Sequence, residues 1–167
     1  CRLGQGCSGQ GAERLTAAIE ILVDADACPV KEEIYTVAFR YETPVTVVAN
    51  QPIRIPRHEL IRRVTVTDGY DAADDYVAEH AHSRAVVVTA DILLAERCLK
   101  KDAEVISPRG EPFTKDSIGA AIAARALMAD LRAGAESAGG GPAPFQKADR
   151  SRFLQKLDET LVRMRRT

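Results

Sequence analysis

The sequence has little of what marks several large protein classes. It contains no Trp and only 5% aromatic residues, which excludes an extensive aromatic platform for stacking nucleic-acid bases. Its net charge at pH 7 is -1, which excludes a strongly basic coat but allows a local basic patch. The longest apolar runs, such as residues 85–88, are far too short to span a bilayer. No signal-peptide pattern is found, and we expect a cytoplasmic protein with no membrane partner.

Cysteine is also scarce, with four residues at positions 1, 7, 28 and 98. This number does not form the dense disulfide framework of small secreted domains, so we expect reduced thiols. No Cys/His pair follows Cys1 and Cys7 to complete a metal site. Cys28 precedes Pro29 at an expected helix start. We interpret it as a packed side chain because no His is evidently linked to it.

The 167 residues include 46% hydrophobic and 28% charged residues, a proportion typical of soluble globular proteins. Residues 1–11 are rich in Gly, Gln and Ser, and we predict that residues 1–18 form a disordered or vector-derived tail. Residues 19–133 predict one α/β domain, residues 134–147 a Gly/Pro linker, and residues 148–167 a C-terminal helix that packs on the domain.

Short β-branched runs alternate with helical spacings along the domain. We predict strands over 19–23, 44–49, 63–67, 85–89 and 103–106, with a loop over 107–114. We predict helices over 29–40, 71–81, 91–101, 115–132 and 149–166. This order favours a mostly parallel sheet of about five strands with helices on both faces, an α/β/α sandwich. Ligands of such sheets gather at the carboxyl ends of the strands.

Aspartates cluster at those predicted strand ends. Asp24 and Asp26 close the first strand and Asp91 follows the fourth, while Asp68 closes the third and precedes Asp71, Asp74 and Asp75. Helix capping explains Asp71 and Asp91 equally well, and Asp116 at another helix start. Two carboxylates at one buried strand end repel each other unless something compensates them. Mg²⁺ takes hard oxygen ligands, so the sequence predicts a metal or phosphate-transfer site near Asp24.

Two chemistries fit these acids. In metal-dependent hydrolysis, carboxylates hold cations that activate water and neutralise the leaving oxygen of a phosphodiester. In haloacid-dehalogenase-type phosphatases, the first Asp of an Asp-x-Asp pair is the nucleophile, and "VDADA" at 23–27 resembles that pair. Ala27 stands where those enzymes usually have Thr or Val, and their Lys and acidic motifs are missing, so this is the minor alternative.

Basic residues that could hold phosphate lie in two loops. Arg54, Arg57, His58, Arg62 and Arg63 fall within ten residues, and Arg109 and Lys115 flank a later Pro/Gly loop. If they lie beside the acids, they form a phosphate groove; the alternative is a solvated loop with scattered charges. The candidate substrate-binding residues are Asn50, Arg54, Arg57, Arg109 and Lys115.

Several long motifs, in one colinear order, resemble the YaiI/YqxD family of uncharacterised bacterial proteins. They are "VDADACPVK" (23–31), "VANQPIRIP" (48–56), "DAADDYV" (71–77), "VVTADILLAE" (87–96), "SPRGEPFTKDSIG" (107–119) and "GGGPAPF" (139–145). That family is grouped with PIN-like domains. The resemblance therefore implies a parallel sheet between helices with acids at one edge, and the Mg²⁺- or Mn²⁺-dependent nuclease class.

The resemblance also implies roles for single residues. Asp24 matches the acid that closes the first PIN strand, and residues 89–91 resemble a Thr-x-Asp motif. Residues 73–75 resemble the Glu-Ala-Asp-Asp motif of 5′-nucleases, with Ala72 in place of Glu, and Leu93 replaces a second Asp. These departures imply fewer ligands, and one metal instead of two. The implied catalytic residues are Asp24, Asp75 and Asp91, and the implied metal ligands are Asp24, Asp26, Asp74, Asp75 and Asp91.

We therefore expect a Mg²⁺- or Mn²⁺-dependent nuclease or phosphodiesterase that acts on RNA or single-stranded nucleic acid. The competing expectation is a catalytically silent PIN-like module that binds RNA or a protein partner through the same cleft. Three or more carboxylates within reach of one metal would favour the enzyme.

Overall fold

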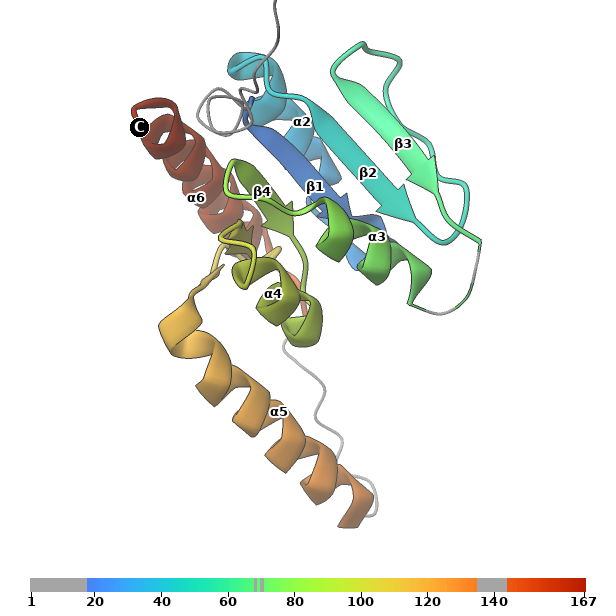
Figure 1. The fold of residues 1–167 in the computed structure, drawn as a ribbon, viewed down its shortest axis with the longest axis vertical. Helices are drawn as coiled ribbons and strands as arrows, with labels where there is room; N and C mark the ends of the chain where they lie inside the picture. Colours follow the sequence, from blue (N-terminus) through green and yellow to red (C-terminus); the bar gives the residue numbers. More distant parts are fainter. Residues whose placement is uncertain (1–17, 68, 70, 135–143) are drawn as a thin grey trace, which may run out of the picture.

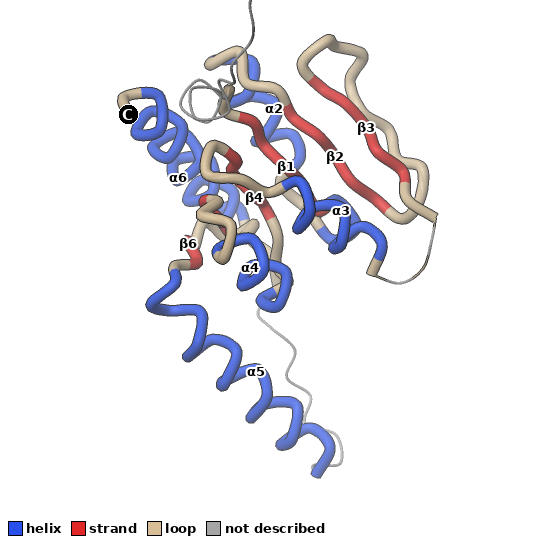
Figure 2. Tube along the Cα trace, in the orientation of Figure 1, coloured by secondary structure: helices blue, strands red, loops and turns tan. Residues whose placement is uncertain are grey.

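The computed structural model describes residues 18–67, 69, 71–134 and 144–167. Within these residues, six strands form one sheet in the order β3-β2-β1-β4-β5-β6. The strands are β1 (Glu20–Asp24), β2 (Val45–Ala49), β3 (Ile61–Thr65), β4 (Ala85–Val88), β5 (Glu104–Ile106) and β6 (Pro112–Phe113). Neighbours among β1 to β5 pair in parallel, and β6 pairs antiparallel with β5. The predicted α/β class with a mostly parallel sheet is confirmed (Figure 2).

Helices cover both faces of this sheet, which makes three layers (Figure 1). They are α2 (Lys31–Arg40), α3 (Ala72–His80), α4 (Ile92–Leu99), α5 (Lys115–Gly134) and α6 (Lys147–Arg165), with a short 3-10 helix η1 (Ala25–Ala27) after β1. α2 and α6 pack on one face, and α3, α4 and the start of α5 on the other. None of the helices in the described ranges is long and apolar enough to cross a bilayer.

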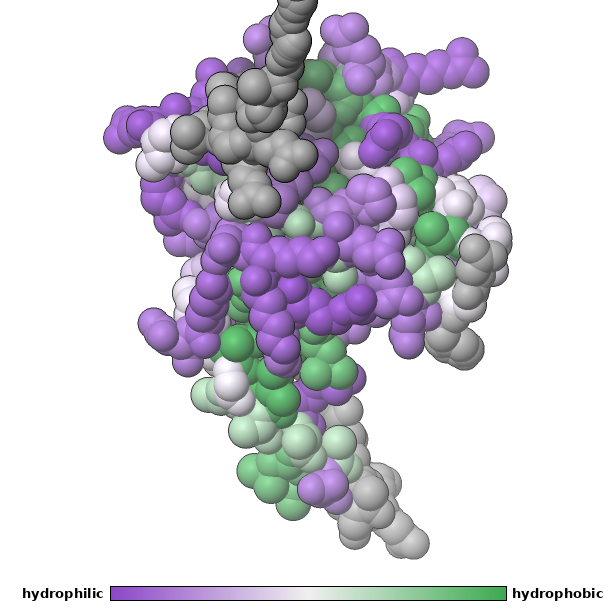
Figure 3. All heavy atoms as spheres, in the orientation of Figure 1, coloured by the Kyte–Doolittle hydropathy of each residue, from purple (hydrophilic) through white to green (hydrophobic). Residues whose placement is uncertain are grey.

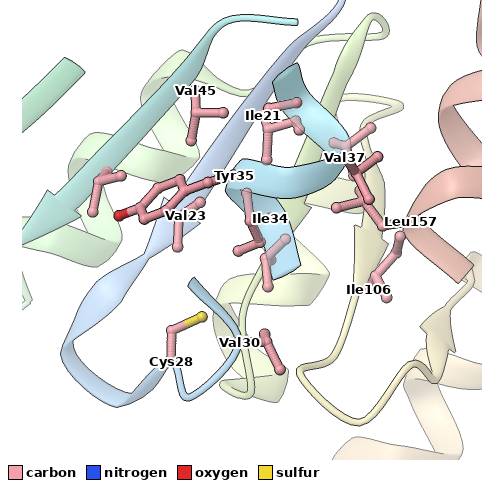
Figure 4. Close-up of a cluster of buried hydrophobic side chains, with 14 of the residues drawn as sticks. Ile21, Val23, Cys28, Val30, Ile34, Tyr35, Val37, Val45, Ile106 and Leu157 are labelled. Carbon is pink, nitrogen blue, oxygen red and sulfur yellow. The ribbon is translucent and has the colours of Figure 1, made fainter. Parts of the chain in front are cut away.

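The central strand β1 is buried on both sides. Ile21 and Val23 are 0% exposed and join a core with Ile34 of α2 and Leu157 of α6 (Figure 4). Leu22, which points the other way, is 1% exposed and joins the core under α3 and α4. Successive side chains of a strand point to opposite faces, so a continuous apolar run is what a doubly covered strand requires.

Several element boundaries differ from the sequence expectation. β3 covers 61–65 instead of 63–67, because the buried Ile61 pairs with Val45 at the start of β2. The expected 107–114 loop contains β6: the Ser107 hydroxyl accepts the backbone N–H groups of Arg109 and Glu111, and this turn returns the chain to β5. Hydrogen bonds of this local kind produce no apolar periodicity in the sequence, so β6 could not be predicted from it.

The ends of the last two helices also differ. α5 ends at Gly134 instead of 132, and α6 begins at Lys147 instead of 149. The carboxylate of Asp149 accepts the backbone N–H of Gln146 at 2.9 Å, which starts α6 early. The Oγ1 of Thr114 accepts the N–H of Ser117 at 3.1 Å and caps α5, so the cap is Thr114 and not Asp116. The expected tail and most of the expected linker lie outside the described residues.

The second half of α5 projects away from the sheet (Figure 1). Leu127, Met128 and Leu131 on it are 59%, 49% and 56% exposed. Figure 3 shows the apolar surface of this part of the molecule beside the mostly hydrophilic surface over the sheet.

The β5–β6 turn lies directly on the backbone of α6. Gly110 has φ +84, and a Cβ built there would lie 2.7 Å from the carbonyl carbon of Arg152. Glycine is required because this left-handed φ is strained for other residues and the neighbouring atoms belong to a helix backbone.

We therefore expect Gly110→Ala to lower the free energy of unfolding by roughly 2 kcal/mol, measured by urea denaturation. Gly119→Ala is the matched control, because a Cβ at this position in α5 meets nothing within 4 Å. The control is expected to be neutral or to stabilise by up to about 1 kcal/mol. Equal effects of the two variants would contradict the close approach of Gly110 to α6.

Candidate functional site

A single hydroxyl group joins two of the predicted acids. Thr89 follows β4 and is 1% exposed. Its Oγ1 donates to Oδ2 of Asp24, at the end of β1, and accepts the backbone N–H of Asp91, both at 3.0 Å. Asp91 in turn caps α4, because its Oδ1 accepts the N–H groups of Leu93 and Leu94 at 2.9 and 3.3 Å. Asp24 and Asp91 are thereby fixed at the same edge of the sheet.

Asp74, in the first turn of α3, faces this pair. Burial raises its pKa to about 6, and the negative charges of Asp24, Asp91 and Asp71 add to the rise. The pKa of Asp24 is also raised, mainly by burial and then by Asp26 and Asp91, while the hydrogen bond from Thr89 opposes the rise. Carboxylates that lie this close repel one another when ionised. We call Asp24, Asp26, Asp74 and Asp91 the acidic edge.

Asp26 connects the acidic edge to the end of β2. Its two carboxylate oxygens accept the backbone N–H of Asn50 at 3.1 and 3.2 Å. Asn50, a predicted substrate-binding residue, therefore lies beside the acids. Its Oδ1 is buried and has no hydrogen-bond partner within the described part of the chain.

Asp75 points elsewhere. Its Oδ1 lies 2.9 Å from Nη1 of Arg97 on α4, in an ion pair in which both side chains are about half exposed. Neighbouring helix positions differ by about 100° in direction, so only one of Asp74 and Asp75 can face the edge, and it is Asp74. Asp71 stands before α3 without a side-chain capping bond, and Asp68 lies outside the described residues.

The acidic edge is not a closed metal cage. Among the residues that the structure describes, no three His, Cys, Asp or Glu side chains are arranged to hold a metal ion. Mg²⁺, however, usually keeps several waters and binds one or two protein carboxylates together with substrate phosphates. The residues present therefore fit a cation that is held in part by its substrate.

The predicted basic residues do not gather at this edge as one group. Arg54 and Arg57 are exposed on the connection from β2 to β3. The ring of His58 lies 4.7 Å from that of Phe39, near the end of α2, and Ile61 pairs with the first residue of β2. Arg57 thus lies toward the amino ends of the strands, away from Asp24.

The remaining basic candidates are held by other elements. Arg62 and Arg63 donate to the Tyr76 hydroxyl and to the Ile53 carbonyl. Arg109 pairs with Asp149 of α6 at 3.2 Å, and Lys115 pairs with Asp102. Arg109 follows β5 and so belongs to the carboxyl side of the sheet.

The sequence analysis identified Thr89 as part of a Thr-x-Asp motif but gave its side chain no role, and the structure shows that its hydroxyl positions Asp24. A signal was available, because a hydroxyl residue stood between a buried strand and a helix-capping Asp. The two described cysteines fit the packed interpretation. Burial raises the pKa of Cys28 to about 11 and that of Cys98 to about 12, so both are protonated at neutral pH and unsuited to nucleophilic attack.

The sequence profile described as "Uncharacterized BCR, YaiI/YqxD family" matches residues 22–163. The chain belongs to the YaiI/YqxD family. A UPF0178 protein of Sphingopyxis alaskensis is 64% identical over 146 residues, which is 87% of this chain and 95% of the relative. A UPF0178 protein of Nitrobacter winogradskyi is 55% identical over 149 residues, 89% and 94% of the two chains. No solved structure gives a significant match.

The crowding of carboxylates in this YaiI/YqxD protein predicts a pH-dependent effect of Asp74→Asn. The pKa of Asp74 is raised from 3.8 to about 6 in the folded state, so folding disfavours its ionised form. Below about pH 4, Asp74 is protonated in both the folded and the unfolded state and does not lower the free energy of unfolding. As the pH rises through about 6, ionisation in the folded state lowers the free energy of unfolding. We expect Asp74→Asn to be more stable than the wild type at about pH 7, by up to about 1 kcal/mol because solvent screens the repulsion.

Urea denaturation in EDTA at about pH 4 and about pH 7 measures this difference, which should vanish at the lower pH. Asp75→Asn is the matched control at the neighbouring position, because it removes a partner of Arg97 and relieves no crowding. A gain in stability for Asp75→Asn as large as that for Asp74→Asn would contradict the assignment of Asp74 to the acidic edge.

Proposed function

We propose that this protein is a Mg²⁺- or Mn²⁺-dependent phosphodiesterase that cleaves RNA or another single-stranded nucleic acid at the acidic edge. The observation that carries the proposal is the approach of carboxylates from three elements, β1, α3 and the start of α4, at the carboxyl ends of parallel strands. Ligands of open α/β sheets bind at such ends. The PIN-like resemblance supports the same chemistry.

Each acid has a role that its position supports. Asp24 and Asp91 would hold the cation, and the Thr89 hydroxyl keeps the Asp24 carboxylate oriented toward it. A bound Mg²⁺ or Mn²⁺ supplies charge neutralisation and a water of lowered pKa. Asp74, which approaches Asp24 and Asp91 from the first turn of α3, would accept a proton from an attacking water.

The test is a calorimetric Mn²⁺ titration together with hydrolysis of bis(p-nitrophenyl) phosphate and of a fluorescent single-stranded RNA. Asp24→Asn should weaken Mn²⁺ binding at least about tenfold and remove hydrolysis of both substrates. The fold should be retained, because Asn can still accept the Thr89 hydrogen bond. Asp130→Asn, on α5 and outside the acidic edge, is the control with the same chemical change and should match the wild type.

Other outcomes identify the alternatives. The open arrangement of the acids favours one of them, a silent module that binds nucleic acid or a protein partner without cleaving it. In that case the wild type would hydrolyse no phosphodiester with Mg²⁺ or Mn²⁺. Hydrolysis of p-nitrophenyl phosphate without hydrolysis of diesters would instead support the phosphatase with Asp24 as nucleophile.

A further inference from the structure

Four positive side chains gather where α2, the β5–β6 turn and the start of α6 meet. We call Lys31, Arg109, Arg150 and Arg152 the α6 basic cluster. The guanidinium groups of Arg109 and Arg150 lie 5.8 and 5.1 Å from the ring centre of Phe145. Arg109 and Arg152 both pair with Asp149. Shared contacts to one ring and one carboxylate therefore hold three arginines together.

Lys31 joins this cluster through the backbone. Its Nζ donates to the carbonyl of Cys28, and Nη1 of Arg150 donates to the next carbonyl, that of Pro29, both at 2.8 Å. Two positive groups therefore meet on consecutive peptide units of the segment that connects η1 to α2. This contact fixes α6 to α2 at the carboxyl side of the sheet.

The arginines of the cluster are more exposed to solvent than the acids with which they pair. These acids are Asp149 and Glu33, whose side chains are 5% and 18% exposed. The side chains of Arg150 and Arg152 are 44% and 65% exposed. The guanidinium groups of Arg150 and Arg152 thus lie further out than the two acids with which the cluster pairs. Glu32, next to Lys31, and Glu111, two residues after Arg109, are also exposed. Arginine and lysine side chains of this kind bind phosphate oxygens.

The cluster borders the acidic edge. The Nζ of Lys31 donates to the carbonyl of Cys28, which comes two residues after Asp26 of the acidic edge. Only η1 separates Asp24 from Cys28 along the chain. A negatively charged chain that lies on the cluster would therefore place a phosphate beside the carboxylates. Arg57, in contrast, lies toward the amino ends of the strands.

We propose that the α6 basic cluster binds the sugar–phosphate backbone of the single-stranded nucleic acid that the acidic edge cleaves. The substrate class rests on the proposed function. Lys and Arg contacts to phosphate carry no sequence information, and the few aromatic residues of the chain supply no alternative platform. Binding should therefore be independent of sequence and strongly dependent on salt.

The experiment is a fluorescence-anisotropy titration of a labelled oligouridine of roughly 12 nucleotides at several salt concentrations, in EDTA. Lys31→Gln/Arg152→Gln should lower the slope of log affinity against log salt by about 1.4, because each lost phosphate contact removes about 0.7. With equal affinities at about 1 M salt, the same slope change corresponds to about 25-fold weaker binding at about 0.1 M salt. Lys31→Gln alone, which leaves Asp149 with both arginines, should lower the slope by about 0.7.

Two controls test whether the effect depends on the positive charges and on their position in the cluster. Arg163→Gln/Arg166→Gln removes two exposed charges from the opposite end of the α6 region and should leave the slope unchanged. Lys31→Arg/Arg152→Lys keeps both charges and should bind as the wild type does. A slope change in the first control as large as in the cluster variant would overturn the proposal, as would an unchanged slope in the cluster variant or a wild type that binds no oligouridine.

Hydrolysis of bis(p-nitrophenyl) phosphate distinguishes this inference from the proposed function. That substrate has one phosphate and no backbone, so the cluster variant should hydrolyse it as the wild type does. A cluster variant that loses this hydrolysis would overturn the separate binding role. A wild type that binds oligouridine without metal but hydrolyses no diester would instead refute only the proposed function.

Discussion

The structure depends on the parallel pairing of β1 with strands on both of its sides. This pairing places Ile21, Leu22 and Val23 in the middle of two cores and brings the end of the strand to the carboxyl edge of the sheet. Asp24 is the first residue at which the chain leaves this apolar environment, and it is still partly buried. Its position, its raised pKa and its bond to Thr89 all follow from where the central strand ends.

Without a bound cation, the acidic edge therefore lowers the stability of the folded protein. The negative charges of Asp24, Asp91 and Asp71 raise the pKa of Asp74, and Arg97, which opposes this rise, pairs with Asp75. Local arrangements that disfavour folding persist where the surrounding structure determines them, and functional sites are where they concentrate. Two well-packed cores supply that surrounding structure here.

Much of this could be predicted from sequence, because β1, β2 and β4 are continuous apolar runs and the helices have clear apolar periods. The sequence also predicts where the acids gather, because the carboxyl ends of parallel strands lie at the same edge of a sheet. β6 could not be predicted, since its pairing depends on the turn built by Ser107, which has no periodicity. The choice between Asp74 and Asp75 required the rotation of α3, and the place of Arg57 required the path of the β2–β3 connection. The meeting of Lys31 with Arg150 joins residues 119 positions apart in the sequence, and only the tertiary fold brings them together.

The position of α6 in the chain has a consequence for biosynthesis. Phe153, Leu157 and Leu161 are 0% exposed and fill the core between α6, α2 and the sheet, yet they come after every other element in chain order. The face under α3 and α4 can close with residues that are already synthesised, whereas the α2 face stays uncovered until translation has passed α6. Uncovered apolar surface on a growing chain is what chaperones bind and what causes aggregation. During translation, the α2 face is therefore the side of this protein that needs protection.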